Sequence, residues 1–494
     1  MNTISRRGFL AASAAMLAAS QFPMRAYGQQ TAPLSLAAAK RTLDIDGRAA
    51  TVLGLAGPSG QGLLLDPGQR FSVDLTNDLS VPTIIHWHGQ IPPNAQDGVP
   101  DMPQPLLQPG ETRSFDFAPL SGTHWMHSHV PIQEIQLLAA PLIVRRPEDV
   151  TADRQELVLF LHDFAFKTPE EVLEEITSGG GGGHGAVEVP GSAQGMNHGG
   201  MAGMNHRPAD GTESMPMNMG NMEMDLNDYN WDAYLANDRT LSDPEIVQVE
   251  RGGRVRLRVI NAAAATVFWI DTGTVEGWLV AVDGHEVQPV TGSRFGLAMG
   301  QRLDIEIDLP NEGNAWPILA LREGARERTG VVLATPGAKI TKIEALSDTE
   351  APAFDAHLVQ ESRLVAIDGL ATKAAERSHT VVLGGGMQPY VWTIDGATWG
   401  KHRPITAVSG ERVELRFNNM SMMGHPMHLH GHAFQVVGIN GRRFEGARRD
   451  TVYVPPMSEV TVALDAGEAA SWMLHCHHMP HLATGMMTEL RIAA

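Results

Sequence analysis

The sequence predicts an all-β protein built from β-sandwiches, and three observations lead to this class. Short runs of alternating apolar and polar residues, typical of half-buried strands, recur between Gly, Pro, Asn and Asp. Helical patterns are few, and "PEEVLEEI" at residues 169–176 is a short exception. A pattern of Gly, then Arg, then an alternating strand ending in Asn occurs near residues 70, 255 and 412. This weak internal repeat indicates three related β domains.

The domain boundaries follow from this repeat and from the length of the chain. A chain of 494 residues, 43% hydrophobic and 19% charged, can form two to four soluble globular domains. We place the boundaries near residues 150 and 350. The predicted domains are therefore residues 29–150, 151–350 and 351–494.

The N-terminus has the pattern of an export signal. The stretch "SRRGFL" places a twin arginine before an apolar run of about a dozen residues, too short to cross a bilayer. Small residues in "AYG" offer a cleavage site before Gln29. We interpret residues 1–28 as a Tat signal that engages the Tat translocase during export. Because no later apolar stretch is long enough to span a membrane, the mature protein is expected to be soluble and periplasmic.

The charge of the chain restricts its partners. The formal net charge is −19, which argues against nucleic acid as a main partner because such binding depends on clustered Lys and Arg. An acidic surface weakly favours a cationic substrate or a metal ion through electrostatic steering. Taken alone, the charge is better explained by acidity that only keeps the protein soluble.

The stretch 178–224 differs in composition from the rest of the chain. It is rich in Gly and contains eight of the 24 methionines but no branched apolar run that could build a core. The sequence therefore predicts a mobile insertion in the second domain. Thioethers are soft ligands that select Cu(I), although the methionines of a neutral loop could also be incidental.

Histidines two residues apart occur in four short motifs. Since residues i and i+2 of a strand share a face, each pair presents two imidazoles to one side. The motifs are "HWHG" with His86 and His88, "HSH" with His127 and His129, "HPMHLHG" with His425, His428 and His430, and "HCH" with His475 and His477. Four such motifs in one exported chain indicate metal binding.

The single cysteine lies in the last of these motifs. The two-residue period that sends His475 and His477 to one face sends Cys476 to the other, so one strand can serve two metal sites. Two histidines, a cysteine and a weak methionine ligand describe a blue-copper site, and His481 and Met486 follow at suitable positions. Zinc is the alternative metal, but structural zinc sites use four ligands and do not need so many histidines.

The order HxHG, HxH, HPxHxHG and HCHxxxHxxxxM resembles the multicopper oxidases across nearly the whole mature chain. The resemblance implies three cupredoxin-like Greek-key domains and four copper ions, with O2 reduced to water. It implies type 1 ligands His425, Cys476, His481 and Met486, type 2 ligands His86 and His428, and type 3 ligands His88, His127 and His477 on one ion and His129, His430 and His475 on the other.

The same resemblance bears on proton delivery at two further positions. Asp97 in "QDGVP" matches an aspartate that delivers protons near the type 2 copper, although Asp before Gly98 is also a common turn. Many bacterial cuprous oxidases carry an acidic residue directly after the second blue-site histidine, where this chain has Leu482. This departure from the family pattern puts that proton route in doubt.

The reductant has two main candidates. Cu(I) in copper tolerance is favoured by the export signal, by the Met-rich stretch and by Met423, which matches a methionine that contacts substrate copper in copper-tolerance oxidases. Ser421 stands where an acidic partner of that copper is expected. A laccase-like oxidase of phenols or amines is the alternative. A copper buffer without catalysis is a third possibility, which the complete ligand set disfavours.

Overall fold

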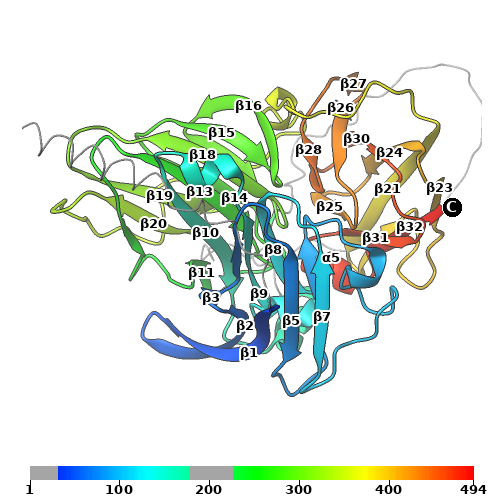
Figure 1. Ribbon diagram of the computed structural model, residues 1–494, viewed down its shortest axis with the longest axis horizontal. Helices are drawn as coiled ribbons and strands as arrows, with labels where there is room; N and C mark the ends of the chain where they lie inside the picture. The colour runs from blue at the N-terminus through cyan, green and yellow to red at the C-terminus, as the bar shows by residue number, and fades with distance from the viewer. Residues whose placement is uncertain (1–31, 179–225) are drawn as a thin grey trace, which may run out of the picture.

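The computed structural model describes residues 32–178 and 226–494, which form three β-sandwiches (Figure 1). The predicted all-β class is confirmed. The predicted signal at residues 1–28 and the insertion, apart from Ser178, lie outside the described residues. Within the described ranges no helix is both long and apolar enough to cross a bilayer. The boundaries near residues 150 and 350 stay predictions.

The first sandwich has a five-stranded and a four-stranded sheet. The five-stranded sheet has the order β3 (Gly60–Gln61), β2 (Arg48–Gly57), β1 (Leu34–Ile45), β5 (Phe71–Asn77) and β7 (Thr112–Phe117). The four-stranded sheet has the order β4 (Leu63–Leu65), β9 (Ala139–Val144), β8 (Gly122–Ser128) and β6 (Ile85–His88).

The second sandwich has a six-stranded and a five-stranded sheet. The first has the order β11 (Ala233–Ala236), β10 (Gln155–Phe164), β13 (Arg254–Asn261), β18 (Arg302–Asp308), β15 (Gly277–Val282) and β16 (His285–Gly292). The other has the order β12 (Ile246–Gln248), β20 (Arg328–Ala334), β19 (Ala315–Arg322), β14 (Phe268–Asp271) and β17 (Arg294–Leu297).

The third sandwich has a seven-stranded and a five-stranded sheet. The first has the order β22 (Tyr390–Ile394), β21 (Arg377–Met387), β24 (Arg412–Asn419), β30 (Glu459–Asp465), β26 (Phe434–Ile439) and β27 (Arg442–Arg443), with β28 (Arg448–Arg449) also on β26. The other has the order β23 (Ile405–Val408), β32 (Met487–Ala493), β31 (Ser471–Cys476), β25 (His425–Leu429) and β29 (Thr451–Val454).

The helices in the described ranges are short. They are η1 (Asn94–Gln96), α2 (Pro131–Ile135), α3 (Pro147–Thr151), α4 (Pro169–Thr177), η2 (Glu361–Arg363) and α5 (Met479–Ala483). The segment predicted to be helical forms α4, which begins with a capping box between Thr168 and Glu171 and has Pro169 in its first turn.

The sequence repeat corresponds to equivalent strands of the three sandwiches. Its members are β5, β13 and β24, and each pairs in parallel with one strand and antiparallel with another. The Asn that ends each repeat is fully buried. The Oδ1 atoms of Asn77, Asn261 and Asn419 each accept the backbone N–H two residues later, and their Nδ2 atoms donate to backbone carbonyls. These amides satisfy buried backbone groups where the chain leaves the strand.

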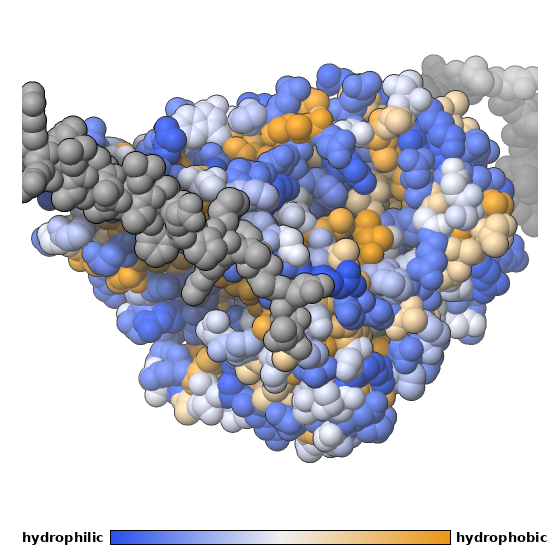
Figure 2. Space-filling model, in the orientation of Figure 1, coloured by the Kyte–Doolittle hydropathy of each residue, from blue (hydrophilic) through white to orange (hydrophobic). Residues whose placement is uncertain are grey.

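The core of the first sandwich shows why the strand pattern alternates. In β5 the side chains of Phe71, Val73 and Leu75 are buried, and the intervening residues are half-exposed. The Phe71 ring packs on Trp87 of the opposite sheet at 4.8 Å and on Phe117 at 4.4 Å between ring centroids. Hydrophobic residues of the second and third sandwiches form one continuous buried cluster. The face of the molecule shown in Figure 2 is largely hydrophilic with scattered apolar patches.

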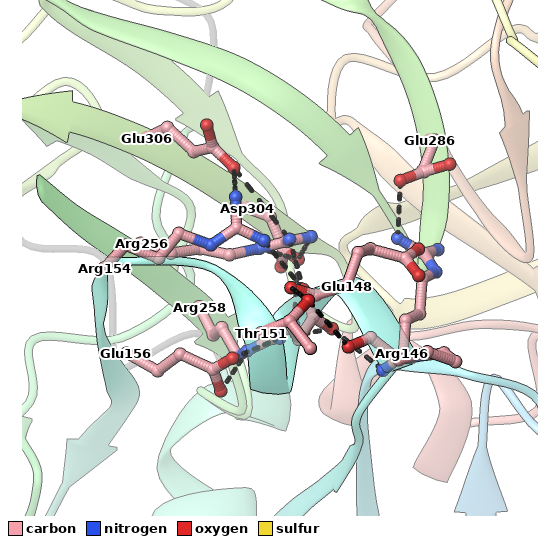
Figure 3. A network of polar contacts seen from close by, with 12 residues as sticks. Arg146, Glu148, Thr151, Arg154, Glu156, Arg256, Arg258, Glu286, Asp304 and Glu306 are labelled. Atoms are coloured by element: carbon pink, nitrogen blue, oxygen red, sulfur yellow. Dashed lines mark hydrogen bonds and ion pairs between the residues drawn. The ribbon is translucent and has the colours of Figure 1, made fainter. Parts of the chain in front are cut away.

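A buried network of ion pairs joins the first two sandwiches (Figure 3). Arg256 of β13 contacts Asp149 of α3 at 2.8 Å and Asp304 of β18 at 2.6 Å. Thr123 of β8 donates to Asp304, and Arg258 donates to Thr123. Burial alone would raise the pKa of Asp304, but the charges of the two arginines outweigh it and lower that pKa. The network keeps β8, which carries candidate ligands, fixed against the second sandwich.

Candidate metal centre

The histidines of the first and third sandwiches meet between these two domains. Strands β6 and β8 pair so that His86 lies opposite His127, and β25 and β31 pair so that His428 lies opposite His475. Each histidine motif lies at the C-terminal end of its strand, and its last residue is one or two positions beyond the strand. Strand ends from two domains therefore place their imidazoles in one common space. Figure 1 shows β8 of the first sandwich near β25 and β31 of the third.

Eight of these histidines form three groups, two of which share His88, and within each group the possible ligand atoms lie within 4.8 Å of one another. The groups are His86, His88 and His428; His88, His127 and His477; and His129, His430 and His475. All eight side chains are buried. The Nε2 atoms of His86 and His428 lie 3.3 Å apart, and those of His430 and His475 lie 3.0 Å apart. The second and third groups hold the residues that the family resemblance implied for the type 3 pair, and the first group adds His88 to the two residues implied for type 2 copper.

Hydrogen bonds made by the ring nitrogen that faces away from the common space orient most of these rings. The Nδ1 atoms of His86, His127, His428 and His475 lie 2.8–3.0 Å from the backbone carbonyls of Asp97, Ser128, Asp450 and Cys476, respectively. An Nδ1–H that donates to a carbonyl leaves Nε2 with its lone pair toward the common space. The tautomer is thus set by the fold before any metal binds.

Several other ring nitrogens of these histidines have no hydrogen-bond partner, so their lone pairs are free to bind a metal. The Nε2 atoms of His127, His129 and His477 and the Nδ1 atom of His88 are buried without a hydrogen-bond partner. Burial lowers the pKa of His129, His430, His475 and His477 far below the usual value, so these rings are neutral at pH 7. Neutral imidazoles with unpaired lone pairs are good ligands for copper ions.

His88 is oriented by a carboxylate that the sequence motifs did not identify. Its Nε2 lies 2.9 Å from Asp450 Oδ1, which leaves Nδ1 as the atom that can bind a metal. Arg302 of β18 forms a double ion pair with Asp450. Burial raises the pKa of Asp450, but the charge of Arg302 outweighs it and holds the pKa well below its usual value. The second sandwich thereby supports the site although it contributes none of the predicted ligands.

Asp97 lies at the same cluster. Its Oδ2 accepts from His430 Nδ1 at 2.9 Å, and its Oδ1 is buried without a hydrogen bond, 3.5 Å from His86 Nδ1. Gly98 follows with φ +88°, and a Cβ there would lie 1.9 Å from the Ile85 carbonyl oxygen. Only glycine allows the loop to approach β6 this closely, so both the turn and the contact with histidines are real features of Asp97.

A second group of ligands lies on the other face of β31. His425, Cys476 and His481 are completely buried together. The two Nδ1 atoms are 3.1 Å apart and lie 3.7 Å and 3.6 Å from the Cys476 sulfur. Met486 is also fully buried, and its carbonyl accepts the Cys476 N–H at 3.1 Å. Cys476 therefore faces one group while its neighbours His475 and His477 face the other.

The repeat Asn of the third sandwich orients His425. The Ser421 hydroxyl donates to Asn419 Oδ1 at 2.8 Å and lies 2.8 Å from His425 Nε2. Because the hydroxyl proton is used on Asn419, the His425 Nε2–H is the donor to Ser421, which turns Nδ1 toward Cys476. The residue that stands where an acid was expected thus has a structural role.

Burial also sets the protonation state of Cys476 when no metal is bound. Burial strongly raises the pKa of the Cys476 thiol, so without a metal the sulfur carries a proton at neutral pH. A bound metal ion deprotonates a coordinating thiol outright. The donor set of two imidazoles, one thiolate and a nearby thioether fits copper better than zinc.

Three acidic contacts of ligand histidines were missed by sequence reasoning. They are Asp450, Glu134 of α2, which lies 3.3 Å from His127 Nδ1, and Asp228, which lies 3.4 Å from His481 Nε2. Glu134 follows "HSH" closely enough to have been considered. The other two come from segments remote in sequence from their histidines, so no spacing could reveal them.

The remaining predicted residues are also located by the structure. Met423 is buried with 3% of its surface exposed and lies two residues before His425. Leu482 is buried in α5 directly after His481, and no acid occupies that position. The outer edge of His481 is covered by the stacked ring of His478 at 3.9 Å and by Asp228, to which Tyr390 donates.

Comparison with known proteins agrees with this arrangement. Family models for multicopper oxidases match residues 40–149, 156–336 and 372–494, which together make up most of the chain. The chain belongs to the multicopper oxidase family. It is accordingly a copper-dependent oxidoreductase that uses O2 and carries type 1, type 2 and type 3 copper.

Individual relatives support the family and the fold. The chain is 29% identical to "Multicopper oxidase MmcO" of Mycobacterium tuberculosis, over 98% of this chain and 96% of that protein. It is 24% identical to "Copper resistance protein A" of Escherichia coli, over 89% and 88%. The structure of Fet3p, a multicopper oxidase that functions in iron import, superposes with a TM-score of 0.72 at 17% identity, covering 93% of this chain and 90% of that one. This superposition confirms the cupredoxin-like fold of the sandwiches.

Proposed function

We propose that this multicopper oxidase is a periplasmic cuprous oxidase that uses electrons from Cu(I) to reduce O2 to water in copper tolerance. The ligands are assigned as the resemblance to the family implies. Type 1 copper takes His425, Cys476, His481 and Met486; type 2 takes His86 and His428; the type 3 pair takes His88, His127 and His477 on one ion and His129, His430 and His475 on the other.

Strand β31 connects the two sites. When copper is bound, the type 1 ion accepts single electrons and the other three ions deliver four electrons to O2. The chain supplies the connection, because the side chain of Cys476 lies at one site and its bonded neighbours His475 and His477 lie at the other. The buried ligands keep solvent away from this connection.

Proton supply is assigned to Asp97. Its Oδ1 is buried without a partner beside His86, and its Oδ2 is bonded to His430. A carboxylate with a free oxygen at this position can hold a proton next to the space where O2 binds. The resemblance suggests two positions for a proton-delivering acid. Because Leu482 occupies the one after His481, the role is assigned to Asp97 at the other.

The observation that carries the choice of Cu(I) is a group of exposed methionines. Among the described residues, large exposed methionine side chains occur at Met420, Met422 and Met457, with 56%, 37% and 55% of their surface exposed. Met420 and Met422 flank Ser421, and the Met457 N–H donates to the Ser421 carbonyl at 3.3 Å. Ser421 in turn contacts His425. The exposed methionines therefore belong to two segments that meet at Ser421, a residue in contact with a proposed type 1 ligand, and thioethers are soft ligands that select Cu(I).

Met423 provides the inner step of this path. Its side chain is buried, and in the sequence it lies between the exposed Met422 and the ligand His425. We propose that Cu(I) binds first to the exposed methionines and that Met423 holds it next to the type 1 site. The Met-rich stretch 178–224, outside the described residues apart from Ser178, is proposed to collect Cu(I) for this surface.

The location and the cellular role rest on separate support. The twin-arginine stretch of residues 1–28 supports export by the Tat translocase to the periplasm. The similarity to a protein named copper resistance protein A supports a role in copper tolerance.

The test compares Cu(I) and phenol oxidation in a variant with Met420, Met422 and Met457 all replaced by Leu. Leu keeps the apolar volume but removes the soft sulfur, so kcat/KM for Cu(I) is expected to fall by about tenfold or more while phenol oxidation is unchanged. Met102→Leu, a half-buried methionine in the first sandwich, is the control.

Two outcomes would favour the alternatives. If the triple variant oxidised Cu(I) normally, the methionine surface would not be the entry site and the laccase-like function would gain support. If the wild-type protein bound Cu(I) but consumed no O2, it would be a copper buffer.

A further inference from the structure

The segment 226–231 of the second sandwich reaches the outer edge of the Cys476 group in the third. It lies outside every motif that the sequence pattern singled out, and it leads into β11. Asp228 in this segment is buried. Its Oδ2 lies 3.4 Å from His481 Nε2 and accepts from the hydroxyl of Tyr390 in β22. Through this carboxylate the second sandwich touches a proposed type 1 ligand directly.

The second sandwich fixes the segment on both sides of Asp228. Arg322 of β19 donates to Asn227 Oδ1 and to the Tyr229 carbonyl, each at 3.0 Å. The Asn227 amide donates in turn to the Glu323 carbonyl at 3.0 Å. The side chain of Tyr229 is buried in the core that the second and third sandwiches share. The carboxylate of Asp228 therefore has a fixed position when it faces the third sandwich.

Ring contacts restrict the tilt of His481 but not the choice between its two edges. His478 stacks on it with 3.9 Å between the ring centroids and 15° between the planes, and Trp392 packs on it at 4.1 Å and 33°. A half turn of the imidazole about its bond to Cβ would keep both contacts. That half turn would place a C–H, instead of Nδ1, toward Cys476. Packing alone therefore does not orient the ligand atom.

Asp228 supplies the missing preference. In the observed orientation His481 turns Nε2 to the carboxylate and Nδ1 to the Cys476 sulfur. This Nε2 is buried without a closer polar partner, and 3.4 Å is long for a hydrogen bond. A metal ion on Nδ1 leaves the proton on Nε2 and makes that N–H a stronger donor, so metal binding strengthens the contact.

The charge of Asp228 is available to this contact. Its Oδ1 is buried without a hydrogen-bond partner, and no Lys or Arg of the described ranges pairs with the carboxylate. The Nε2 atom of His478 lies 3.6 Å from Oδ2, beyond hydrogen-bond distance. A negative charge beside a ligand stabilises Cu(II) more than Cu(I), because the attraction grows with the charge of the ion.

We propose that Asp228 is a positioning residue of the type 1 site, which accepts the His481 Nε2–H and couples type 1 copper to the attachment of segment 226–231. Copper that binds more tightly with Asp228 in place also holds the segment more tightly, because such coupling is reciprocal. Asp228 lowers the type 1 potential and so favours strong reductants. This inference rests on the proposed assignment of His481 to type 1 copper.

The first test measures copper retention and potential in the complete copper-loaded protein, by following the blue absorption. In Asp228→Ala, type 1 copper is expected to be lost at about 10- to 100-fold lower chelator concentration. The loss of affinity is expected to be at least tenfold larger for Cu(II) than for Cu(I), which corresponds to a rise of about 59 mV in the potential.

Two further variants separate the charge from the hydrogen bond and from general damage. Asp228→Asn keeps an acceptor oxygen and the shape of the side chain, so it should retain most of the copper affinity but still raise the potential. Asp232→Asn is the matched control, because this exposed aspartate of the neighbouring turn accepts the Phe166 N–H at 2.7 Å and contacts no ligand. Its copper retention and potential should equal those of the wild type.

The second test measures the coupling by hydrogen exchange of segment 226–231. In the wild-type background the segment is expected to exchange tenfold or more faster in Cys476→Ser, which lacks type 1 copper, than in the copper-loaded protein. In the Asp228→Ala background this difference should disappear. Segments of the first sandwich, such as 71–77, serve as the internal reference and should exchange equally in all forms.

The outcomes separate this inference from the assignments beneath it. Wild-type copper retention and potential in both Asp228 variants, or equal exchange of the segment with and without type 1 copper, would overturn the proposal. Should Asp228→Ala fail to fold, the potential of Asp228→Asn decides, and an unchanged value overturns the proposal. A fully loaded wild-type protein without blue absorption would count against the type 1 assignment. Absent Cu(I) oxidation with the predicted shifts intact would count against the proposed function alone.

Discussion

Replacing Ser421 by Ala should loosen the type 1 site without unfolding the protein. In the structure the Ser421 hydroxyl lies 2.8 Å from His425 Nε2 and donates to Asn419. The variant leaves the His425 N–H buried without an acceptor. His425 is then free to rotate its ring away from the orientation that points Nδ1 toward Cys476.

The size of the effect follows from this one contact. Leaving a buried donor unsatisfied costs about 1–3 kcal/mol. Loss of a contact that orients a metal ligand typically reduces metal affinity by about 10- to 100-fold, which corresponds to about 1.4–2.7 kcal/mol. The two estimates agree, so we expect type 1 copper in Ser421→Ala to be lost at about 10- to 100-fold lower chelator concentration.

The assay follows the blue thiolate-to-copper absorption during titration with a chelator. Ser458→Ala is the control, because its buried hydroxyl donates to the Pro456 carbonyl at 3.1 Å and contacts no ligand. Ser421→Thr keeps the hydroxyl and should restore most of the affinity. Ser421→Ala with wild-type copper retention would refute the assigned role of this hydroxyl.

Three more predictions address other parts of the site and the fold. Cys476→Ser should bleach the blue absorption and stop turnover while part of the copper remains, and blue colour in that variant would contradict the type 1 assignment. His127→Ala should leave the blue site reducible but block its reoxidation by air, and reoxidation at the normal rate in stopped flow would contradict the type 3 assignment. Burial raises the pKa of Glu323 to about 7, so the unfolded chain loses this proton first and stability falls by ~3 kcal/mol as pH rises from about 4.5 to 7. Glu323→Gln can still accept the Phe354 N–H and should abolish this fall in denaturant titrations at pH 5 and 8, whereas an unchanged pH dependence would contradict the pKa shift.

Much of the fold could be predicted from local patterns. The alternation in segments such as 71–77 and 412–419 identifies strands, because one face of each packs on the opposite sheet. The repeated terminal Asn marked equivalent positions of three domains because the same turn leaves each strand there. The pairing of β5 with β1 and of β24 with β21 could not be predicted, since it depends on contacts between residues far apart in sequence.

The ligands were predictable for a similar reason. Spacing by two residues places His475 and His477 on one face of a strand and Cys476 on the other, and the structure gathers all three with partners from other strands. The residues that orient the ligands were not predictable in this way. Asp450 and Asp228 reach their histidines from other elements, and nothing in the spacing of either aspartate distinguishes it from a surface acid.

The exposed methionines show a further limit of sequence reasoning. Sequence analysis identified Met423 beside the "HPMHLHG" motif, but it gave no reason to consider Met457. Its position over Ser421 depends on a backbone contact between two loops of the third sandwich. Only the folded chain shows that Met457 lies next to the segment that carries Met420 and Met422.

The most direct test of the proposed cuprous oxidase activity is steady-state O2 uptake with Cu(I) as the only reductant, followed from low to saturating Cu(I) with the concentration of free copper controlled. The account predicts saturable uptake with four Cu(I) consumed for each O2, and loss of this uptake in Cys476→Ser. O2 uptake that is no faster than spontaneous Cu(I) oxidation, in a protein that holds its full complement of copper and oxidises phenols, would contradict it.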